Sequence, residues 1–391
     1  MNFYLPTRDE CQELIKTTEA FYCSTKTVEG QVVEMYDYRL AGYTDFFPED
    51  GRNWTELRGL TFVQQEDGTW ERNILLQKFF NINQTIGWMY DDVKDKKISR
   101  VQNKEDGSII SFVKFANGKV RAKSKMSFES DQAQMSQDIY ETNKNIRIYV
   151  NYCLDKNLVP IFELVGYSNQ IVLNYDVEKE LILLQVRDGI DGEYFIKNDY
   201  EGLKEVKRRY HIKITEDFRL HGFAEMNILD SLLSLKETSQ EDIEGWVVTF
   251  EDGQMAKIKT NKYLSLHGLI GPDAFRENLL VQTILDGNID DVIAALVPGT
   301  KKDKLVGLTS KVEHHFNILV KEVLALSHLY VNNYNMDRKE FALQYKTHRM
   351  FSSFMKILHT TSENNAERAV RDYVLRQCKS LSGAQDYLKR L

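Results

Sequence analysis

The chain has 391 residues, 42% of them hydrophobic, a composition ordinary for a globular protein and a length sufficient for two domains. A core of that size needs no disulfide or metal to hold it together. The four cysteines form no C-x-x-C pair, which argues against a zinc or redox site and favours a reducing compartment: Cys11, Cys23, Cys153 and Cys378. Glu313-His314-His315 is not expected to bind a metal, because its histidines lack the i, i+4 spacing of a helical ligand pair.

The net charge of −7 is the sum of two parts of opposite sign. Residues 299–391 contain 16 Lys and Arg against 9 Asp and Glu, whereas residues 1–298 contain 35 against 49. A basic C-terminal part on an acidic body is typical of a polyanion-binding module joined to a catalytic domain that uses metal ions. A helical bundle with a solvated lysine-rich face explains the same charges equally well.

No membrane or secretory segment is expected. Residues 1–6 have no basic stretch followed by an apolar one, so they do not resemble a secretory signal. The longest aliphatic run, 292–297, is far too short to cross a bilayer. We therefore expect a soluble, cytoplasmic protein.

Up to about residue 265 the chain is predicted to form strands and turns, with helices near 8–19, 128–155 and 222–237. Hairpin turns are indicated between runs rich in β-branched and aromatic residues, at Asp67-Gly68, Asn117-Gly118 and Asp252-Gly253. These patterns predict an α+β domain built on antiparallel sheets.

After residue 270 the pattern becomes helical. Apolar residues at intervals of three and four predict one long amphipathic helix: Leu305, Leu308, Val312, Phe316, Leu319, Val323 and Leu326. Two further helical segments, 337–359 and 364–388, follow, and Pro272 and Pro298 are expected between helices. We predict an antiparallel-sheet domain at 1–268 and an all-α C-terminal domain at 269–391.

The motif that carries the chemistry is Lys104-Glu105-Asp106-Gly107-Ser108, predicted to lie just before the strand 108–113. By itself it is also compatible with a charged turn. Other charged residues accompany it in order. The predicted strand 254–259 contains Lys257-Ile258-Lys259, whose two ammonium groups should project from the same face because side chains alternate along a strand. Lys123-Ser124-Lys125 repeats that arrangement on the strand expected to pair with that of Lys104.

Two glutamates, Glu163 and Glu244, lie beside residues typical of buried strands. Such a carboxylate is costly unless it has a cation or metal partner, although solvent exposure would explain either one separately. Lysine is a nucleophile only when deprotonated, which neighbouring cations favour. The same cations can neutralise charge on an α-phosphate as pyrophosphate leaves. Gly107 is expected to let a nucleotide approach the strand closely. Together these groups suit nucleotidyl transfer to Lys104.

Further segments follow the same order along the chain: Leu57-Arg58-Gly59-Leu60, Gln77-Lys78-Phe79-Phe80-Asn81, Phe162-Glu163-Leu164, Asn169-Gln170-Ile171-Val172-Leu173, residues 181–187, Glu244-Gly245-Trp246-Val247, Tyr263-x-Ser265-Leu266-His267, and Asp286-Gly287 with Asp290-Asp291. With Lys104 to Ser108 and the two Lys-x-Lys motifs, this series resembles the covalent nucleotidyltransferase superfamily of DNA ligases, RNA ligases and capping enzymes. It is most similar to the RNA ligase 1 family typified by the T-even bacteriophage enzyme, over essentially the whole chain. Trp246 stands where a tyrosine would not be surprising, which bears on contacts to adenosine only.

The resemblance implies an adenylation domain in which Lys104 takes AMP from ATP, with Mg²⁺ or Mn²⁺, while Lys257 and Lys259 act on the α-phosphate. It also implies a set of residues that bind ATP, its phosphates or the RNA 5′-phosphate: Arg58, Lys78, Phe80, Glu105, Gly107, Lys125, Glu163 and Glu244. Glu163 and Glu244 are the expected metal ligands, and Asp290 is a candidate ligand of a second metal. Phe80 is equally compatible with an ordinary core position.

By the same resemblance, three phosphoryl transfers would join a 5′-phosphate to a 3′-hydroxyl of single-stranded RNA or nicked tRNA through lysyl-AMP and RNA-adenylate. The expected setting is RNA repair by a monomer, in the host cytoplasm if the source is a bacteriophage. Candidate phosphate contacts in the C-terminal domain, which a solvated helix face would explain as well, are Arg368, Arg371, Arg376 and Lys379. The alternatives are a DNA ligase or capping-type enzyme, or a catalytically silent RNA-binding protein on the same fold.

Overall fold

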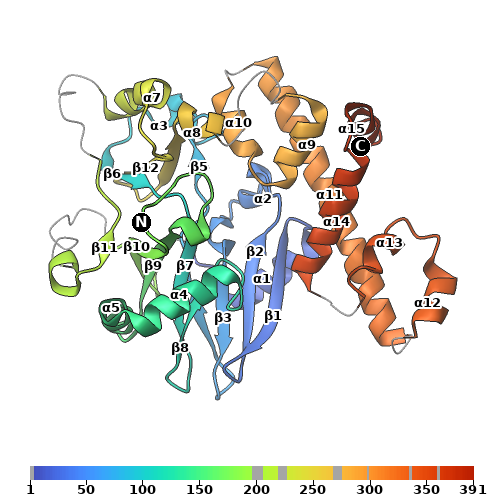
Figure 1. Ribbon diagram of the computed structural model, residues 1–391, viewed down its shortest axis with the longest axis horizontal. Helices are drawn as coiled ribbons and strands as arrows, with labels where there is room; N and C mark the ends of the chain where they lie inside the picture. Colours follow the sequence, from blue (N-terminus) through green and yellow to red (C-terminus); the bar gives the residue numbers. More distant parts are fainter. Residues whose placement is uncertain are drawn as a thin grey trace. The chain divides into compact units, whose positions relative to one another are not determined.

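The computed structural model describes residues 4–195, 206–218, 227–266, 275–296, 299–333, 337–358 and 362–391. Contacts divide the chain into two compact units (Figure 1). The first consists of Met1–Glu13, Thr25–Asp37 and Tyr43–Gly268, and the second of Leu14–Ser24, Tyr38–Gly42 and Leu269–Leu391. Two short N-terminal segments thus group with the C-terminal helices, and the predicted division after residue 268 stays a prediction. The predicted α+β fold class, with antiparallel sheets followed by a helical region, is confirmed.

One sheet has the strand order β1-β2-β3-β4. Its strands are β1 (Phe21–Val28), β2 (Gln31–Tyr38), β3 (Leu60–Gln64) and β4 (Trp70–Asn73). The hairpin predicted at Asp67-Gly68 connects β3 to β4, and Asp67 accepts a hydrogen bond from the backbone N–H of Thr69 at 2.9 Å. In the sequence, the helix α1 (Arg8–Thr17) precedes β1, and the short helices α2 (Tyr43–Phe46) and η1 (Thr55–Leu57) fall between β2 and β3.

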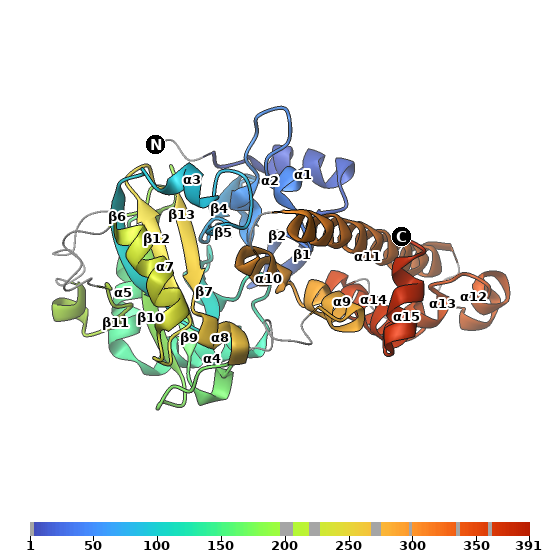
Figure 2. The same ribbon diagram turned by 90° about the horizontal axis from the view of Figure 1, so that it is seen from above.

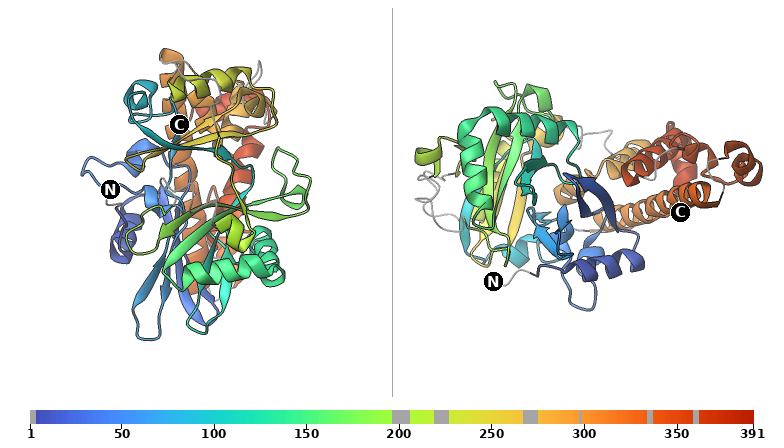
Figure 3. Two further views of the ribbon diagram at one scale, coloured as in Figure 1. Left: turned by 90° about the vertical axis from the view of Figure 1, so that its left-hand side faces the viewer. Right: turned by 90° about the horizontal axis from the view of Figure 1, so that it is seen from below.

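The second sheet has the order β11-β10-β9-β7-β8 and is covered by two helices, seen in the right-hand view of Figure 3. Its strands are β7 (Ser108–Lys114), β8 (Val120–Lys123), β9 (Leu158–Val165), β10 (Glu180–Asp188) and β11 (Lys213–Ile214). The helix predicted at 128–155 is two helices, α4 (Asp131–Thr142) and α5 (Lys144–Leu154), because Asn143 ends the first and caps the second.

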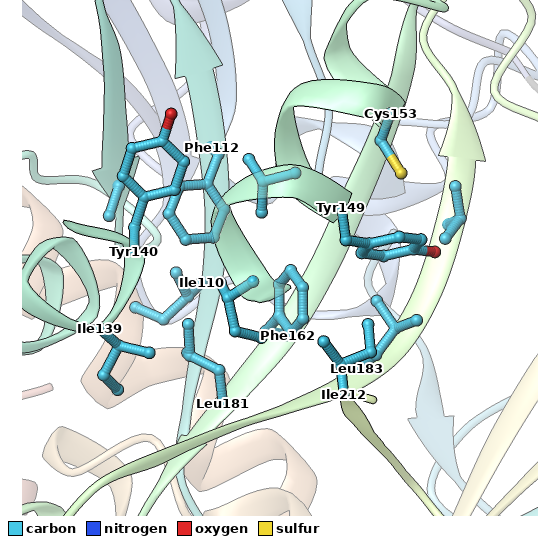
Figure 4. Close-up of a cluster of buried hydrophobic side chains, with 14 of the residues drawn as sticks. Ile110, Phe112, Ile139, Tyr140, Tyr149, Cys153, Phe162, Leu181, Leu183 and Ile212 are labelled. Carbon is cyan, nitrogen blue, oxygen red and sulfur yellow. The ribbon is translucent and has the colours of Figure 1, made fainter. Parts of the chain in front are cut away.

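The core under α4 and α5 is aromatic and aliphatic. Phe112 of β7 and Phe162 of β9 meet edge-on with ring centroids 5.9 Å apart, and Tyr140 and Tyr149 reach them from the two helices (Figure 4). Because side chains alternate along a strand, Ile110 and Phe112 of β7 and Phe162 and Leu164 of β9 face this core, while the residues between them face the opposite side of the sheet.

The third sheet has the order β5-β13-β12-β6 and carries the Lys104 motif. Its strands are β5 (Phe80–Asn81), β6 (Ile98–Lys104), β12 (Gly245–Phe250) and β13 (Met255–Lys259), and nearby helices are α3 (Tyr90–Val93), α7 (Ile228–Thr238) and α8 (Asn261–Leu266). Lys104 is the last residue of β6 and lies just before the strand β7, as predicted, but β6 and β7 belong to different sheets. The expectation that the strand of Lys123 pairs with that of Lys104 is wrong, because β8 pairs with β7 whereas β6 pairs with β12.

In the second unit α9, α13 and α14 pack along the long helix α11 (Figure 2). Its helices are α9 (Glu277–Leu285), α10 (Ile289–Ala295), α11 (Thr300–Asn333), α12 (Arg338–Tyr345), α13 (Phe351–Phe354), α14 (Glu363–Gln377) and α15 (Leu381–Leu388). Arg39 joins an N-terminal segment to α14 through Glu363, at 2.9 Å. Pro272, Pro298 and His267 lie outside the described residues. Within the described ranges no helix is both long and apolar enough to span a bilayer.

Candidate active site

Three neighbouring strand ends bring the predicted catalytic lysines together. In the register of the third sheet, Gly245 at the start of β12 lies opposite Lys104 at the end of β6 and Lys259 at the end of β13. Lys257 lies two residues back on β13, opposite Val247. Because side chains alternate along a strand, Lys257 and Lys259 project from the same face, as the sequence predicted.

Glu244, the residue before β12, joins the two lysines. Its Oε2 accepts a hydrogen bond from Lys104 Nζ at 2.8 Å, and its Oε1 lies 3.0 Å from Lys259 Nζ. The glutamate side chain is only 3% exposed, whereas that of Lys104 is 23% exposed. One buried carboxylate therefore holds two cations, and the Lys104 amine remains accessible to a reactant.

Gly245 is required for this corner of the sheet. Its φ of +149° is one that side-chain-bearing residues rarely adopt, and an added Cβ would lie 2.0 Å from the carbonyl oxygen of Ile258. The close approach of β12 to β13 places Glu244 directly beside Lys259. The Glu-Gly pair thus acts as a unit, because the glycine permits the contact that the glutamate uses.

Gly107 packs closely against β9. An added Cβ there would lie 2.2 Å from the carbonyl oxygen of Leu164 and 3.0 Å from Cγ of Glu163. The missing side chain therefore allows the chain after Lys104 to pack against β9, and the close approach of a nucleotide stays a prediction. This packing brings the second predicted glutamate beside the lysine motif.

Glu163 on β9 is the carboxyl most perturbed by its surroundings in this region. Burial raises its pKa to about 8, while the charges of Lys104 and Arg58 oppose that shift and Glu244 adds to it. A protonated carboxyl can donate a hydrogen bond, and a deprotonated one would need a cation to balance it. The site therefore has one carboxylate paired with lysines and a second that could accept a cation.

Arg58 follows the short helix η1 and is partly exposed. Its charge acts to lower the pKa of the Glu163 carboxyl, against the effect of burial. The next residue, Gly59, has φ +69°, and an added Cβ would lie 2.8 Å from the carbonyl oxygen of Lys125. The turns that carry Arg58 and Lys125 are therefore in direct backbone contact.

Lys123 and Lys125 differ sharply in environment, contrary to the expectation of two ammonium groups projecting together. β8 ends at Lys123, so the alternation does not extend to Lys125. Lys125 is 39% exposed and lies 2.7 Å from buried Asp37, whereas Lys123 is fully buried. Burial lowers the pKa of Lys123 to about 7, with a further lowering from Lys125 and an opposing effect of Asp37.

Lys78 and Phe80 lie toward the other end of the sheet. Phe80 is 1% exposed and packs in an aromatic cluster with Phe46, Phe47 and Trp88. The Lys78 ammonium lies 5.2 Å from the Phe80 ring and lines a pocket of about 320 Å³ together with the 252–254 turn. Their predicted contacts to ATP stay predictions.

Glu105 and Asp106 belong to a network of hydrogen bonds. Glu105 accepts from Tyr175 and Thr215, each at 3.1 Å, and burial raises its pKa. Asp106, to which the sequence assigned no role, accepts from Tyr263 at 2.9 Å and from the backbone N–H groups of residues 172 and 173. It fixes the chain after the nucleophile, and only its place inside the motif could have indicated this.

The predicted metal ligands fall into both units. Glu163 and Glu244 are electrostatic neighbours in the first unit, and carboxylate oxygens are ligands that Mg²⁺ and Mn²⁺ prefer. The Glu163 carboxyl, whose raised pKa shows that its charge is poorly balanced by its neighbours, fits such an ion. Asp290 is in α10 of the second unit. Across the described ranges no three His, Cys, Asp or Glu side chains cluster as a ready-made cation site.

The predicted RNA-binding cations lie on and just after α14. Arg368, Arg376 and Lys379 are at least partly exposed, whereas Arg371 is paired with Asp286. The three side chains other than Arg371 are the ones available to a polyanion without breaking an ion pair seen in the structure.

Comparison with known proteins shows the family of the chain. A family model of RNA ligases of the T4 type 1 matches residues 56–263, more than half of the chain, and the chain therefore belongs to this RNA ligase family. A Thermovibrio ammonificans protein named "Putative RNA ligase" is 24% identical over 322 residues, which cover 80% of each chain.

Solved structures show more distant similarity. An archaeal ATP-dependent RNA ligase has a TM-score of 0.47 and 10% identity, over 81% of this chain and 79% of that one. The RNA ligase of Naegleria gruberi with pyrophosphate has a TM-score of 0.37 and 16% identity, over 63% and 76%.

Proposed function

We propose that this chain is an ATP-dependent RNA ligase that joins RNA 5′-phosphate and 3′-hydroxyl ends through a lysyl-AMP on Lys104. The observation that carries the proposal is the meeting of Lys104, Glu244 and Lys259 at three adjacent strand ends. Family membership supplies the substrate class, and the geometry supplies an accessible amine beside a buried acceptor and a second cation.

In the first step Nζ of Lys104 attacks the α-phosphorus of ATP, the bond to pyrophosphate breaks, and a phosphoramidate to AMP forms. The amine must first lose a proton, and Glu244 Oε2, at 2.8 Å, is within reach to accept it. Release of Lys104 from this ion pair leaves Lys259 on the other carboxylate oxygen, where it can neutralise charge on the α-phosphate.

In the second step an oxygen of the RNA 5′-phosphate attacks the AMP phosphorus, the P–N bond breaks, and Lys104 leaves as an amine with the proton returned by Glu244. In the third, the RNA 3′-hydroxyl loses its proton to solvent water and attacks the activated 5′-phosphate, the bond to AMP breaks, and AMP leaves. Arg58 and Lys125 are the cations we assign to the transferred phosphates. Positioning and charge neutralisation carry most of such a reaction, since every leaving group is already good.

A divalent cation, Mg²⁺ or Mn²⁺, would be held by Glu163 and Glu244, and Asp290 is a candidate ligand of a second, separate cation. When bound it would neutralise phosphate charge. Deprotonation of Glu163 is then coupled to cation binding, because its raised pKa means that the carboxyl without a cation favours the neutral acid.

We extend the proposal to the biological substrate. A single-stranded RNA or nicked tRNA would be selected by the 269–391 region through Arg368, Arg376 and Lys379, with Arg371 contributing if it leaves Asp286. The enzyme would act as a monomer in RNA repair, in the cytoplasm of a host if it is of bacteriophage origin.

The central test is incubation with α-labelled ATP and Mg²⁺ or Mn²⁺, followed by a denaturing gel. We expect label on the wild-type protein and none on Lys104→Ala. Lys114→Ala, which removes an exposed lysine paired with Asp155, is the matched control and should be labelled normally. Label that persists in Lys104→Ala refutes the assignment of the nucleophile.

Transfer of the label separates the proposal from its alternatives. The adenylated protein should pass AMP to 5′-phosphorylated RNA faster than to matched DNA, and equal or inverted rates would favour a DNA ligase. A silent RNA-binding protein would take no label at all. Replacing Arg368 and Arg376 together should weaken RNA binding. The slope of the logarithm of the binding constant against the logarithm of the salt concentration should fall in magnitude by about one for each phosphate that is no longer neutralised.

A further inference from the structure

Lys123 is a buried lysine of the first unit whose hydrogen bonds the proposed function does not explain. Its side chain has no exposed surface, and its Nζ donates to three backbone carbonyl oxygens: Gly59 at 3.0 Å, Lys125 at 3.2 Å and Ser124 at 3.3 Å. An ammonium group has three hydrogens to donate, so three carbonyls satisfy it fully. A buried cation with such a complete set of acceptors is a costly arrangement that a simple strand end does not require.

The three carbonyls belong to two segments that are distant in sequence. Gly59 and Lys123 are 64 positions apart, and the ammonium holds the 58–59 turn against the 124–125 turn. The two turns touch directly, because an added Cβ on Gly59 would be 2.8 Å from the Lys125 carbonyl oxygen. Lys123 therefore donates hydrogen bonds to both turns.

Both turns carry residues that the proposed function uses. Arg58 precedes Gly59, and its charge acts on Glu163, which in turn lies in the field of Lys104. Lys125, on the other turn, is the second residue assigned to the transferred phosphates, and its ammonium lies 2.7 Å from buried Asp37. The buried ammonium thus contacts both turns, and Arg58, on one of them, acts electrostatically on the same Glu163 carboxyl as Lys104 does.

We infer that Lys123 is a positioning residue, which fixes Arg58 and Lys125 relative to Lys104 so that both reach the triphosphate of ATP. The inference rests on the proposed function. Lys123 touches neither substrate nor nucleophile; it acts through the two backbone turns. A displacement of about 1 Å in a positioned group can cost about 100-fold in rate, so removal of this tie should be visible in the first chemical step.

The test is the rate of lysyl-AMP formation in Lys123→Met, which keeps the length of the side chain and removes all three donors. We expect a loss of about 10-fold to 100-fold at a temperature well below the melting point of the variant. Lys119→Met is the matched control, because this lysine is on the same β7–β8 hairpin but is 66% exposed and paired with Glu29. It should react at the wild-type rate.

A mutant cycle distinguishes positioning from general stabilisation. If Lys123 acts through Arg58 and Lys125, then Lys123→Met should cost little further activity once Arg58→Gln and Lys125→Gln are both present. Multiplicative losses in that combined variant would overturn the inference, as would a wild-type rate in Lys123→Met itself. Lys123→Gln, whose amide can still donate to a carbonyl, should recover part of the rate, and a Gln variant no better than the Met variant would contradict the inference.

If Lys123→Met does not fold, Gly59→Ala tests the same contact from the other side, since its methyl group must push the two turns apart. It should slow adenylation while Lys123 is intact, and an unchanged rate would overturn the inference. Failure of the proposed function is distinguishable, because wild-type protein would then take no label. A labelled wild type with an equally labelled Lys123→Met rejects the positioning role alone.

Discussion

Two lysines of the first unit meet their partners in opposite ways. Lys104 stands at a strand end, 23% exposed, and contacts one oxygen of a carboxylate that it shares with Lys259. Lys123 is fully buried and donates to three carbonyls of the backbone. The first contact can break and re-form without disturbing the fold, because Lys259 still holds Glu244. The second cannot, because three buried acceptors would be left without a donor at once.

The contrast shows how one residue type can serve as reactant or as scaffold. A nucleophile must leave its resting partner to attack phosphorus, so a single contact at an accessible position suits it. A positioning residue must not move, so several contacts in a closed site suit it. Variants of Lys104 and Lys123 should therefore separate effects on catalysis from effects on stability, and the following predictions test that separation.

The largest effect is expected from Lys104→Ala, which should abolish lysyl-AMP formation while leaving the fold intact. Glu244 keeps Lys259 as a partner, so no buried charge is stranded. Circular dichroism melting should show a midpoint close to that of the wild type. A large fall in the midpoint would mean that Lys104 also supports the sheet, and the contrast with Lys123 would disappear.

Glu244→Gln should slow adenylation by about 10²-fold to 10³-fold, since it replaces a charge that holds two cations by a neutral amide of the same shape. Single-turnover labelling measures this rate. The control is Glu251→Gln, an exposed glutamate 4.0 Å from Lys97. A wild-type rate in Glu244→Gln would show that Lys104 does not depend on this carboxylate.

Lys123→Met should lower the free energy of unfolding by about 1–3 kcal/mol, the usual cost of leaving buried polar groups without partners. Relief from burying a charge offsets part of this cost. Urea titration of Lys123→Met, Lys119→Met and wild type measures it. A free energy of unfolding that is unchanged in Lys123→Met but lower in Lys119→Met would contradict this prediction.

The smallest effect is a pH dependence at Glu163, measured with a chelator present. Its folded pKa of about 8 lies above the ordinary value, so the folded state binds more protons between about pH 4.5 and 8, and stability falls as pH rises through that window. Glu163→Gln removes this fall, so its melting point should rise relative to wild type from pH 5 to pH 8.5. A constant difference between the two proteins would refute the raised pKa.

Local elements of the fold could be predicted because their signals lie in adjacent residues. The hairpins at Asn117-Gly118 and Asp252-Gly253 connect β7 to β8 and β12 to β13, as their turn residues indicated. The β1–β2 hairpin, which turns at Glu29-Gly30, was missed, since Glu29 adopts a φ of +50° that no preference for that residue would suggest.

Sheet membership could not be predicted, because it depends on pairings between distant segments. Lys104 pairs with Gly245, and nothing local in either segment indicates this. The helices α9 and α10 were given no ranges, although Pro272 and Pro298 were expected between helices, and the predicted helices 128–155 and 364–388 are each divided by a cap, at Asn143 and Ser380. Short polar caps are weak signals in a chain with many Ser and Asn residues.

The sequence predicted which residues belong to the candidate site better than it predicted the contacts between them. The sequence named Lys104, Glu244 and Lys259, but not that one carboxylate joins them. It treated Lys123 and Lys125 alike, although one is buried and the other is not, because burial of a lysine depends on carbonyls supplied by Gly59, far away in the chain. Such information is absent from the local pattern of residue types.

The separation of Lys104 and Glu244 by 140 positions has a consequence for synthesis on the ribosome. At about 5–20 residues per second, roughly 7 to 28 s pass between the two residues. During that interval the nascent chain has the proposed nucleophile but neither the partner strand nor Lys259. A chain that terminates early would therefore contain the lysine and yet consume no ATP, so reactivity arises only when nearly the whole sheet domain has been made.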